Sequence, residues 1–124
     1  MYYIAEALFV GIYSLVLYKG LELVTKIPFA AVLFLLGIVK HGLGYLLGIQ
    51  RAYCKMYKRS HVAVPSSVEL LLEGIVFVVL GLGFQRIVTN KYIAVFLTGF
   101  ILHCVAEWIG VHKWFLTNRC HTLN

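Results

Sequence analysis

Four long apolar stretches, separated by short polar segments, are the feature that most limits how this chain can fold. They cover residues 4–24, 28–50, 67–88 and 92–114. A helix needs about 20 apolar residues to cross the hydrocarbon core of a bilayer, and each stretch meets that length. The chain is 61% hydrophobic and 13% charged, whereas a soluble domain is about half apolar and a quarter charged. The sequence therefore predicts an all-α integral membrane protein, an antiparallel bundle of four transmembrane helices with short loops, in which residues 1–124 form a single domain.

Local signals support the predicted helix ends. Pro28 suits the first turn of the second helix, and Ser66 with Glu69 has the spacing of a capping box at the start of the third. The connection RIVTNK between the third and fourth helices is short, so these two helices are expected to be antiparallel neighbours. The apolar N-terminus lacks the basic region and the small-residue cleavage site of a signal peptide, so we expect it to remain as the first helix.

Small residues recur at a four-residue spacing in several of the predicted helices. The pairs are Ala7 with Gly11, Gly44 with Gly48, and Ala106 with Gly110. Such pairs let the backbones of two helices approach closely, and we expect them to support a packed bundle.

The distribution of basic residues predicts an orientation. Four spans place the N-terminus, residues 51–66 and the C-terminal tail on the same side of the membrane. This side carries the larger basic set: Arg51, Lys55, Lys58, Arg59, Lys113 and Arg119. The other side carries Lys19, Lys26, Arg86 and Lys91. The positive-inside rule therefore predicts that both termini and the loop 51–66 face the cytosol or an equivalent compartment.

The three cysteines, Cys54, Cys104 and Cys120, form neither a CxxC motif nor the spacing of a zinc site. Cys54 and Cys120 fall on the predicted cytosolic side, where we expect them to remain thiols. Cys104 lies within an apolar run and is expected to be a small packing residue.

The loop 51–66 is the one sizeable polar connection between the predicted helices. Its basic residues are Arg51, Lys55, Lys58 and Arg59. Basic segments beside a membrane attract anionic lipid headgroups, so lipid contact is the expected role and a docking surface for an acidic partner protein is the alternative. The sequence has no recognition motif for DNA or RNA, and no nucleic-acid partner is expected.

Ionisable residues inside the apolar stretches are the most informative functional signal. The segment FLTGFILHCVAEWIGVHKW places His103 and Glu107 one turn apart on one face of the fourth helix. A rise of 1.5 Å per residue puts them in the same half of the membrane as ionisable residues of the other helices. The predicted buried polar cluster comprises Glu6, Lys40, His41, Glu73, His103 and Glu107. Buried ionisable groups are costly in a bilayer unless they are paired, so these side chains are expected to face inward.

The simplest interpretation of this cluster is a polar clasp. Lys40 would pair with Glu73 or Glu107, and the histidines would donate to the remaining carboxylates. Glu107 is expected to bond to Lys40, to His41 or to a nearby Trp or Tyr. A metal site would draw on His41, Glu73, His103 and Glu107, but the sequence lacks the Glu-x-x-His pattern of four-helix carboxylate sites, so no metal is expected. A proton or ion path is disfavoured because the opposite half of the membrane is almost wholly apolar.

The motifs present do not indicate catalysis. We find no Ser-His-Asp order, no nucleophile elbow and no HExxH motif, and we expect no cofactor. The expected function is that of a non-enzymatic structural or accessory subunit that anchors or scaffolds a larger assembly, as in an energy-transducing complex, an insertion machinery or a virion membrane. Its partners would be lipid and either other proteins or copies of itself. A small oligomeric ion or proton channel, with His41 or His103 as the pH-sensitive group, is the alternative, and a metal-dependent enzyme acting on lipid comes third.

Overall fold

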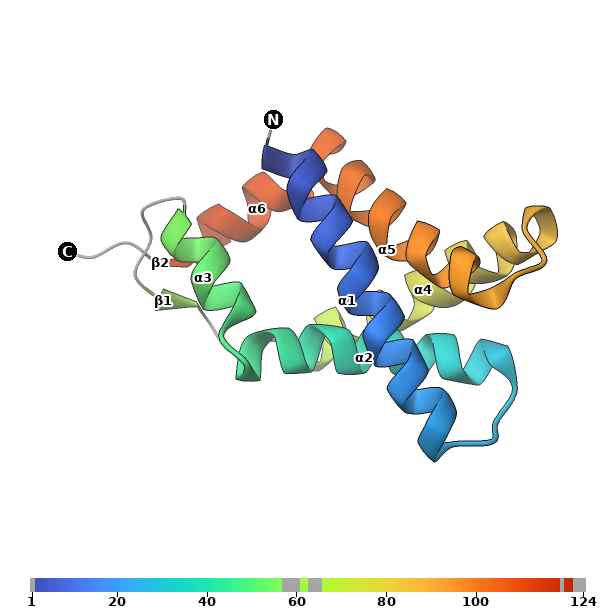
Figure 1. Cartoon of the computed structure of the whole chain (residues 1–124). Helices are drawn as coiled ribbons and strands as arrows, with labels where there is room; N and C mark the ends of the chain where they lie inside the picture. The colour runs from blue at the N-terminus through green and yellow to red at the C-terminus, as the bar shows by residue number, and fades with distance from the viewer. Residues whose placement is uncertain (1, 57–60, 63–65, 119, 122–124) are drawn as a thin grey trace.

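The computed structural model describes residues 2–56, 61–62, 66–118 and 120–121. Lys58 and Arg59 of the predicted basic loop lie outside these residues. The described elements are almost entirely helical (Figure 1). In chain order they are α1 (Tyr2–Val24), α2 (Phe29–Leu46), α3 (Ile49–Met56), β1 (His61–Val62), α4 (Ser67–Ile87), α5 (Lys91–Trp108), α6 (Val111–Asn118) and β2 (Cys120–His121).

Four of the helices are long and apolar enough to cross a membrane, which confirms the predicted all-α class and the predicted number of spans. These spans are Ile4–Val24, Phe29–Leu46, Ser67–Ile87 and Lys91–Trp108. Ser66 caps the start of α4: its hydroxyl accepts from the Glu69 backbone N–H, and its own backbone N–H donates to the Glu69 carboxylate. The predicted capping box is therefore confirmed.

The four spans pack as two helix pairs. α1 packs along α5 and α2 packs along α4, while contacts of α4 with α5 and of α1 with α2 join the two pairs. The chain reverses direction between consecutive spans, so each span runs antiparallel to the spans beside it (Figure 1). The predicted antiparallel contact between the third and fourth spans is confirmed by the contact of α4 with α5.

The apolar core lies toward the end of the bundle that holds the α1–α2 and α4–α5 connections, which we call the narrow end. The core residues are Tyr18, Val32, Leu33, Leu36, Phe77 and Val95. Close approach of α2 and α4 depends on Gly37 and Gly74, because a Cβ on Gly37 would lie 2.6 Å from the Glu73 carbonyl oxygen and 2.7 Å from the Gly74 Cα. Helix packing by small residues therefore occurs, although these two glycines were not in the predicted pairs.

Two spans end earlier than predicted, at Leu46 instead of residue 50 and at Trp108 instead of residue 114. The reason is local: Gly48 and Gly110 adopt positive φ angles of 81° and 87°. Glycine in this conformation just beyond the last turn ends a helix. A Cβ built on either glycine would also have nothing within 4 Å, so the prediction that these two glycines support helix packing is wrong. Of the predicted small residues, Ala7 and Gly11 are buried within the bundle, with a Cβ on Gly11 only 2.8 Å from the Phe96 ring.

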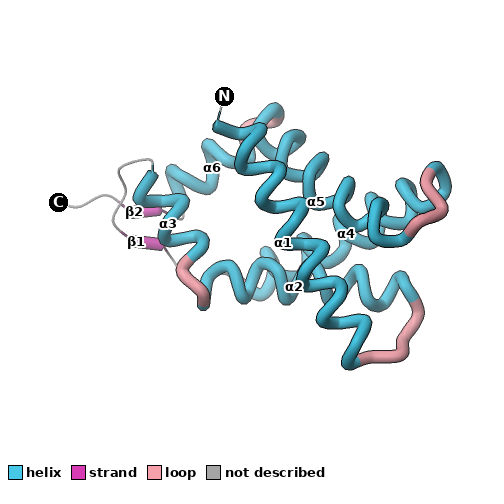
Figure 2. The backbone as a smooth tube through the Cα atoms, viewed as in Figure 1, coloured by secondary structure: helices cyan, strands magenta, loops and turns pink. Residues whose placement is uncertain are grey.

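The chain beyond these two glycines folds into a small unit, which we call the cap and which consists of α3, β1, β2 and α6. In Figure 2 the two strands (magenta) lie beside α3 at the end of the bundle opposite the narrow end. β1 pairs with β2 in antiparallel register, with Val62 opposite Cys120. A disulfide joins Cys54 of α3 to Cys120 of β2, and the rings of Tyr53 and Phe115 meet edge to face at 5.8 Å.

The cap corrects two sequence-based predictions. Residues 51–56, predicted as loop, belong to helix α3. Cys54 and Cys120, predicted as thiols, are bonded to each other across 66 residues of sequence. Neither spacing nor count reveals such a pairing, because it depends on how the tail returns to the loop. Cys104 is buried and free, in agreement with its predicted packing role.

Candidate functional site

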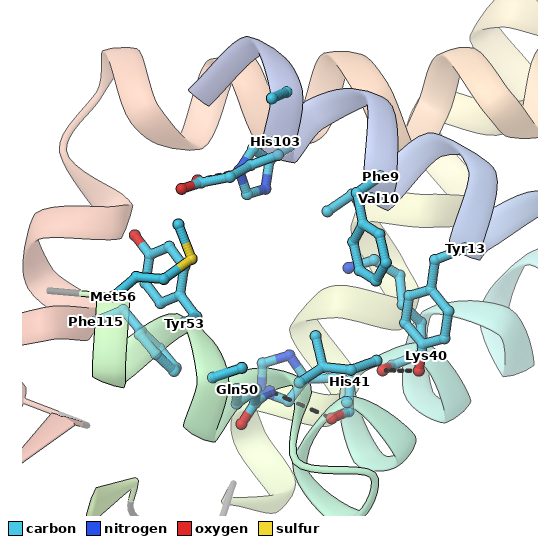
Figure 3. A pocket seen from close by; sticks show the side chains of 15 residues that line it. Phe9, Val10, Tyr13, Lys40, His41, Gln50, Tyr53, Met56, His103 and Phe115 are labelled. Atoms are coloured by element: carbon cyan, nitrogen blue, oxygen red, sulfur yellow. Dashed lines mark hydrogen bonds and ion pairs between the residues drawn. The ribbon is translucent and has the colours of Figure 1, made fainter. Parts of the chain in front are cut away.

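A cavity of about 510 Å³, whose mainly apolar lining includes several polar side chains, lies between the two helix pairs, next to the cap. α1 and α2 cross near the middle of the bundle and separate from there toward the cap (Figure 1). α3 and α6 close the wide side of the resulting wedge (Figure 2). The cavity is therefore bounded by residues of α1, α2, α3, α5 and α6, and Figure 3 shows their side chains around a common open centre.

An ion pair between α2 and α4 forms one wall of the site. Lys40 Nζ lies 2.6 Å from Glu73 Oε1 and 5.5 Å from the centre of the Phe77 ring. Both charged side chains are largely buried, with exposed fractions of 15% and 19%. Lys40 was predicted to pair with Glu73 or Glu107, and it pairs with Glu73. The contact joins two helices that already pack closely through Gly37 and Gly74.

A second pair, on the opposite side of the cavity, joins α5 to α1. His103 Nε2 lies 3.0 Å from Glu6 Oε2, and each side chain is 13% exposed. Figure 3 shows His103 across the open centre from Lys40 and His41. The predicted contact between a histidine and a carboxylate is present here, between two residues that lie 97 positions apart in sequence.

A third contact links His41 to the start of α4. His41 Nε2 lies 3.8 Å from Glu69 Oε2, and the same carboxylate accepts from the Ser66 backbone. Sequence reasoning assigned Glu69 only to the capping box and did not include it in the buried cluster. The available signal was its place one turn before Glu73 on the same face of α4.

Backbone carbonyls of α2 receive two further hydrogen bonds around the cavity. The Tyr13 hydroxyl donates to the Lys40 carbonyl at 3.2 Å, which ties α1 to α2. The Gln50 amide donates to the His41 carbonyl at 3.3 Å, which ties α3 to α2. Neither Tyr13 nor Gln50 was predicted as a site residue, because a lone tyrosine in an apolar run carries no sequence signal for this role.

Glu107 is the predicted cluster member that the structure places elsewhere. It lies in the last turn of α5 and is exposed, so the expectation that it faces the bundle beside His103 is corrected. Residues four apart on a helix are displaced by about 40° around the axis, and α5 ends at the next residue, Trp108. Glu107 therefore lies one turn beyond His103, at the end of the helix.

The remaining five predicted residues do not form one compact cluster. Lys40 pairs with Glu73 and His103 pairs with Glu6 on opposite walls, and His41 contacts Glu69. Within the part of the chain that the structure describes, no group of three or more His, Cys, Asp or Glu side chains is placed to hold a metal ion. The residues named as metal candidates, His41, Glu73, His103 and Glu107, are thus not brought together.

The basic residues Arg51 and Lys55 are exposed on α3. On the same helix Cys54 is buried and Tyr53 lines the cavity, so α3 is amphipathic. A short amphipathic helix with basic residues outward is suited to lie at a membrane surface.

Comparisons of the chain with protein-family models, with curated proteins and with solved structures found no significant match. The fold and the site define a small multi-pass membrane protein with paired charges around a cavity in one half of its bundle.

Proposed function

We propose that this protein is a non-enzymatic structural or accessory subunit that anchors a larger assembly to a bilayer. The pairing of ionisable residues within the spans is the observation that carries the proposal. Lys40 binds Glu73 between α2 and α4. His103 binds Glu6 between α5 and α1. Polar contacts of this kind between helices can fix the position and rotation of those helices, and such contacts serve structure without a reaction.

The cap supplies the surface for contacts outside the membrane. Arg51 and Lys55 are exposed on α3, where each would add about 1 kcal/mol of attraction to an anionic headgroup. We propose that these residues bind lipid headgroups and so hold the amphipathic helix α3 in the interface. The remaining exposed surface of the chain would then contact a partner protein or a second copy of the chain.

The disulfide bears on the orientation of the protein. A bond between Cys54 and Cys120 requires both residues to lie on the same side, which supports a shared side for the loop and the C-terminal tail. Disulfides persist in oxidising compartments, whereas the charge bias favours the cytosol. The charge bias is small and the bond is covalent, so we propose that the cap faces an oxidising compartment instead of the cytosol predicted from charge.

Conduction of ions or protons has less support. The polar residues lie in the half of the bundle next to the cap, and the half toward the narrow end is filled by the apolar core. Ser14 and Thr98 are buried there, but their hydroxyls donate to the carbonyls of Val10 and Ala94 on their own helices. A continuous polar path, which conduction needs, is thus missing from this part of the described structure.

Purification of the chain from its own membrane under mild detergent tests the proposal. We expect the protein to elute in a complex of fixed stoichiometry, much larger than the 14.0 kDa chain in its detergent micelle. The complex should survive replacement of Glu107, which is exposed, by Gln. A monomer that conducts protons in proteoliposomes, with conductance lost in His103→Phe, would contradict the proposal and favour the channel.

A further inference from the structure

The cavity has two kinds of wall, and the difference suggests what it binds. Its volume of about 510 Å³ falls within the range of about 300–1,000 Å³ found for small-molecule sites. Phe9 and Met56 line it and are also 52% and 59% exposed, so they form part of its mouth. Phe9 lies within a membrane span. A mouth bordered by an exposed aromatic ring within a span opens toward hydrocarbon, and its ligand would enter from the lipid phase.

The lining of the cavity is mainly apolar but also carries several polar groups. Tyr13, His41, Gln50, Tyr53 and His103 all contribute to its lining. Hydroxyl, imidazole and amide groups each offer both donors and acceptors of hydrogen bonds. The Tyr13 hydroxyl and the Gln50 amide already donate to backbone carbonyls of α2, but their oxygens can still accept a hydrogen bond. A purely apolar guest would leave these oxygens facing hydrocarbon, which is costly. The ligand therefore needs a polar head as well as an apolar tail.

The ion pairs beside the cavity restrict which polar heads the ligand can have. Lys40 at the cavity wall is neutralised by Glu73 at 2.6 Å. Glu6, across the cavity, is paired with His103 at 3.0 Å. A phosphate or carboxylate head would compete with Glu73 for Lys40 and would repel Glu6, and an ammonium head would meet the reverse conflict. An uncharged head exchanges hydrogen bonds without breaking either pair.

We propose that this cavity binds a membrane lipid with an uncharged, hydroxyl- or carbonyl-bearing head and a hydrocarbon tail. The head occupies the space between Lys40 and His103, and the tail leaves past Phe9 into the bilayer. This binding site goes beyond the anchoring role, since an anchor needs no internal ligand. It makes the protein a receptor or carrier site for a neutral lipid within its assembly.

Photocrosslinking in phosphatidylcholine vesicles tests the proposal. The probe is a photoactivatable, alkyne-tagged monoacylglycerol, compared with a fatty acid and a lysophosphatidic acid that carry the same tagged chain. We expect the monoacylglycerol to label the full-length protein at least about tenfold more than either anion, since one unfavourable charge contact changes an affinity by about this factor. The labelled peptides should contain Phe9 or Met56.

Two glycines of α2 provide a matched pair of variants. Gly44 lines the cavity, and a Cβ there would meet the Gln50 side chain at 3.8 Å, which is ordinary contact. Gly42 has nothing within 4 Å of its Cβ position. Gly44→Leu should lower monoacylglycerol labelling about tenfold by filling the site, and Gly42→Leu should leave it unchanged. Val10→Trp, from the α1 wall, should act like Gly44→Leu and serves if that variant fails to fold.

Three results would overturn the proposal. Equal labelling of the cavity-filling variants and the wild type would show that the probe only touches the outer surface. Equal or stronger labelling by the anionic probes would contradict the neutral head. A covalent dimer as the main product, with little lipid adduct, would show that a second copy of the chain occupies the mouth.

Discussion

Cys54 on α3 and Cys120 on β2 are joined by a disulfide that closes the cap over the wide end of the bundle. Both sulfur-bearing side chains are buried, with exposed fractions of 0% and 1%. The bond connects the segment after α2 to the segment after α5, and these two helices belong to different pairs. It therefore limits how far the two pairs can separate around the cavity.

Reduction of this disulfide is expected to loosen the cap and leave the spans intact. The loss of cap stability should be at most about 4 kcal/mol, the value expected for a closed loop of this size in an otherwise unfolded chain. Hydrogen exchange in bicelles provides the measurement: amides of α3 and α6 should exchange faster after reduction, while amides of α4 should not. Faster exchange throughout α4 would mean that the bond supports the whole bundle.

The side of the membrane on which the cap lies can be measured with thiol reagents. In sealed native vesicles, a membrane-impermeant maleimide should label neither Cys54 nor Cys120 until an impermeant reductant is added from the non-cytosolic side. Cys104 is buried within α5 and should resist throughout. Labelling of Cys54 and Cys120 from the cytosolic side without reductant would instead support the orientation predicted from charge.

The pair between Glu6 and His103 can be compared with the exposed Glu107. Glu6→Leu leaves His103 without this partner in a site where each side chain is only 13% exposed, and breaking a buried pair costs about 3–5 kcal/mol. Glu107→Leu removes an exposed carboxylate from the same end of the bundle and should change stability by less than about 1 kcal/mol. Unfolding in mixed micelles by SDS measures both. Similar losses in the two variants would contradict the placement of Glu107.

The crossing of α2 and α4 makes a sharp prediction for a single methyl group. Gly37→Ala puts a Cβ 2.6 Å from the backbone oxygen of Glu73, and backbone cannot move aside as a side chain does. We expect a loss of about 1–3 kcal/mol, the usual cost of overpacking.

Gly83→Ala is the control for this crossing, because nothing lies within 4 Å of its Cβ position. It should be neutral or stabilising by up to about 1 kcal/mol, since alanine is a better helix former than glycine. If Gly37→Ala were as well tolerated as Gly83→Ala, the two helices would not approach as closely as described. SDS unfolding again provides the measurement.

The spans could be predicted from the sequence because apolar length alone specifies a membrane helix, and the capping box because it is local. The ends of α2 and α5 were harder to predict. Gly48 and Gly110 are signals for helix termination. Apolar residues continue past both glycines, however, so hydropathy alone predicts unbroken helices. The prediction that Glu107 faces the bundle assumed that α5 continues past Trp108, whereas Glu107 lies in the last turn of α5.

The cap and the division of the polar residues into separate pairs could not be predicted in this way. The bond between Cys54 and Cys120 depends on the path of the tail after α6, which no spacing encodes. Depth along each helix correctly grouped Lys40 with Glu73 and Glu6 with His103, but depth does not tell which helices are adjacent. The pairing of α1 with α5 and of α2 with α4 separated these contacts onto opposite walls.

The measurement that tests the structural role of the buried charges most directly is a double-mutant cycle on Lys40 and Glu73. Lys40→Met and Glu73→Leu should each cost about 3–5 kcal/mol, because each leaves the other charge buried. The double variant should recover most of that loss, and it should still enter the same complex in the same stoichiometry. A double variant that folds as stably as the wild type but no longer assembles, or that loses a measurable transport activity, would contradict the account, because these charges would then serve function and not structure.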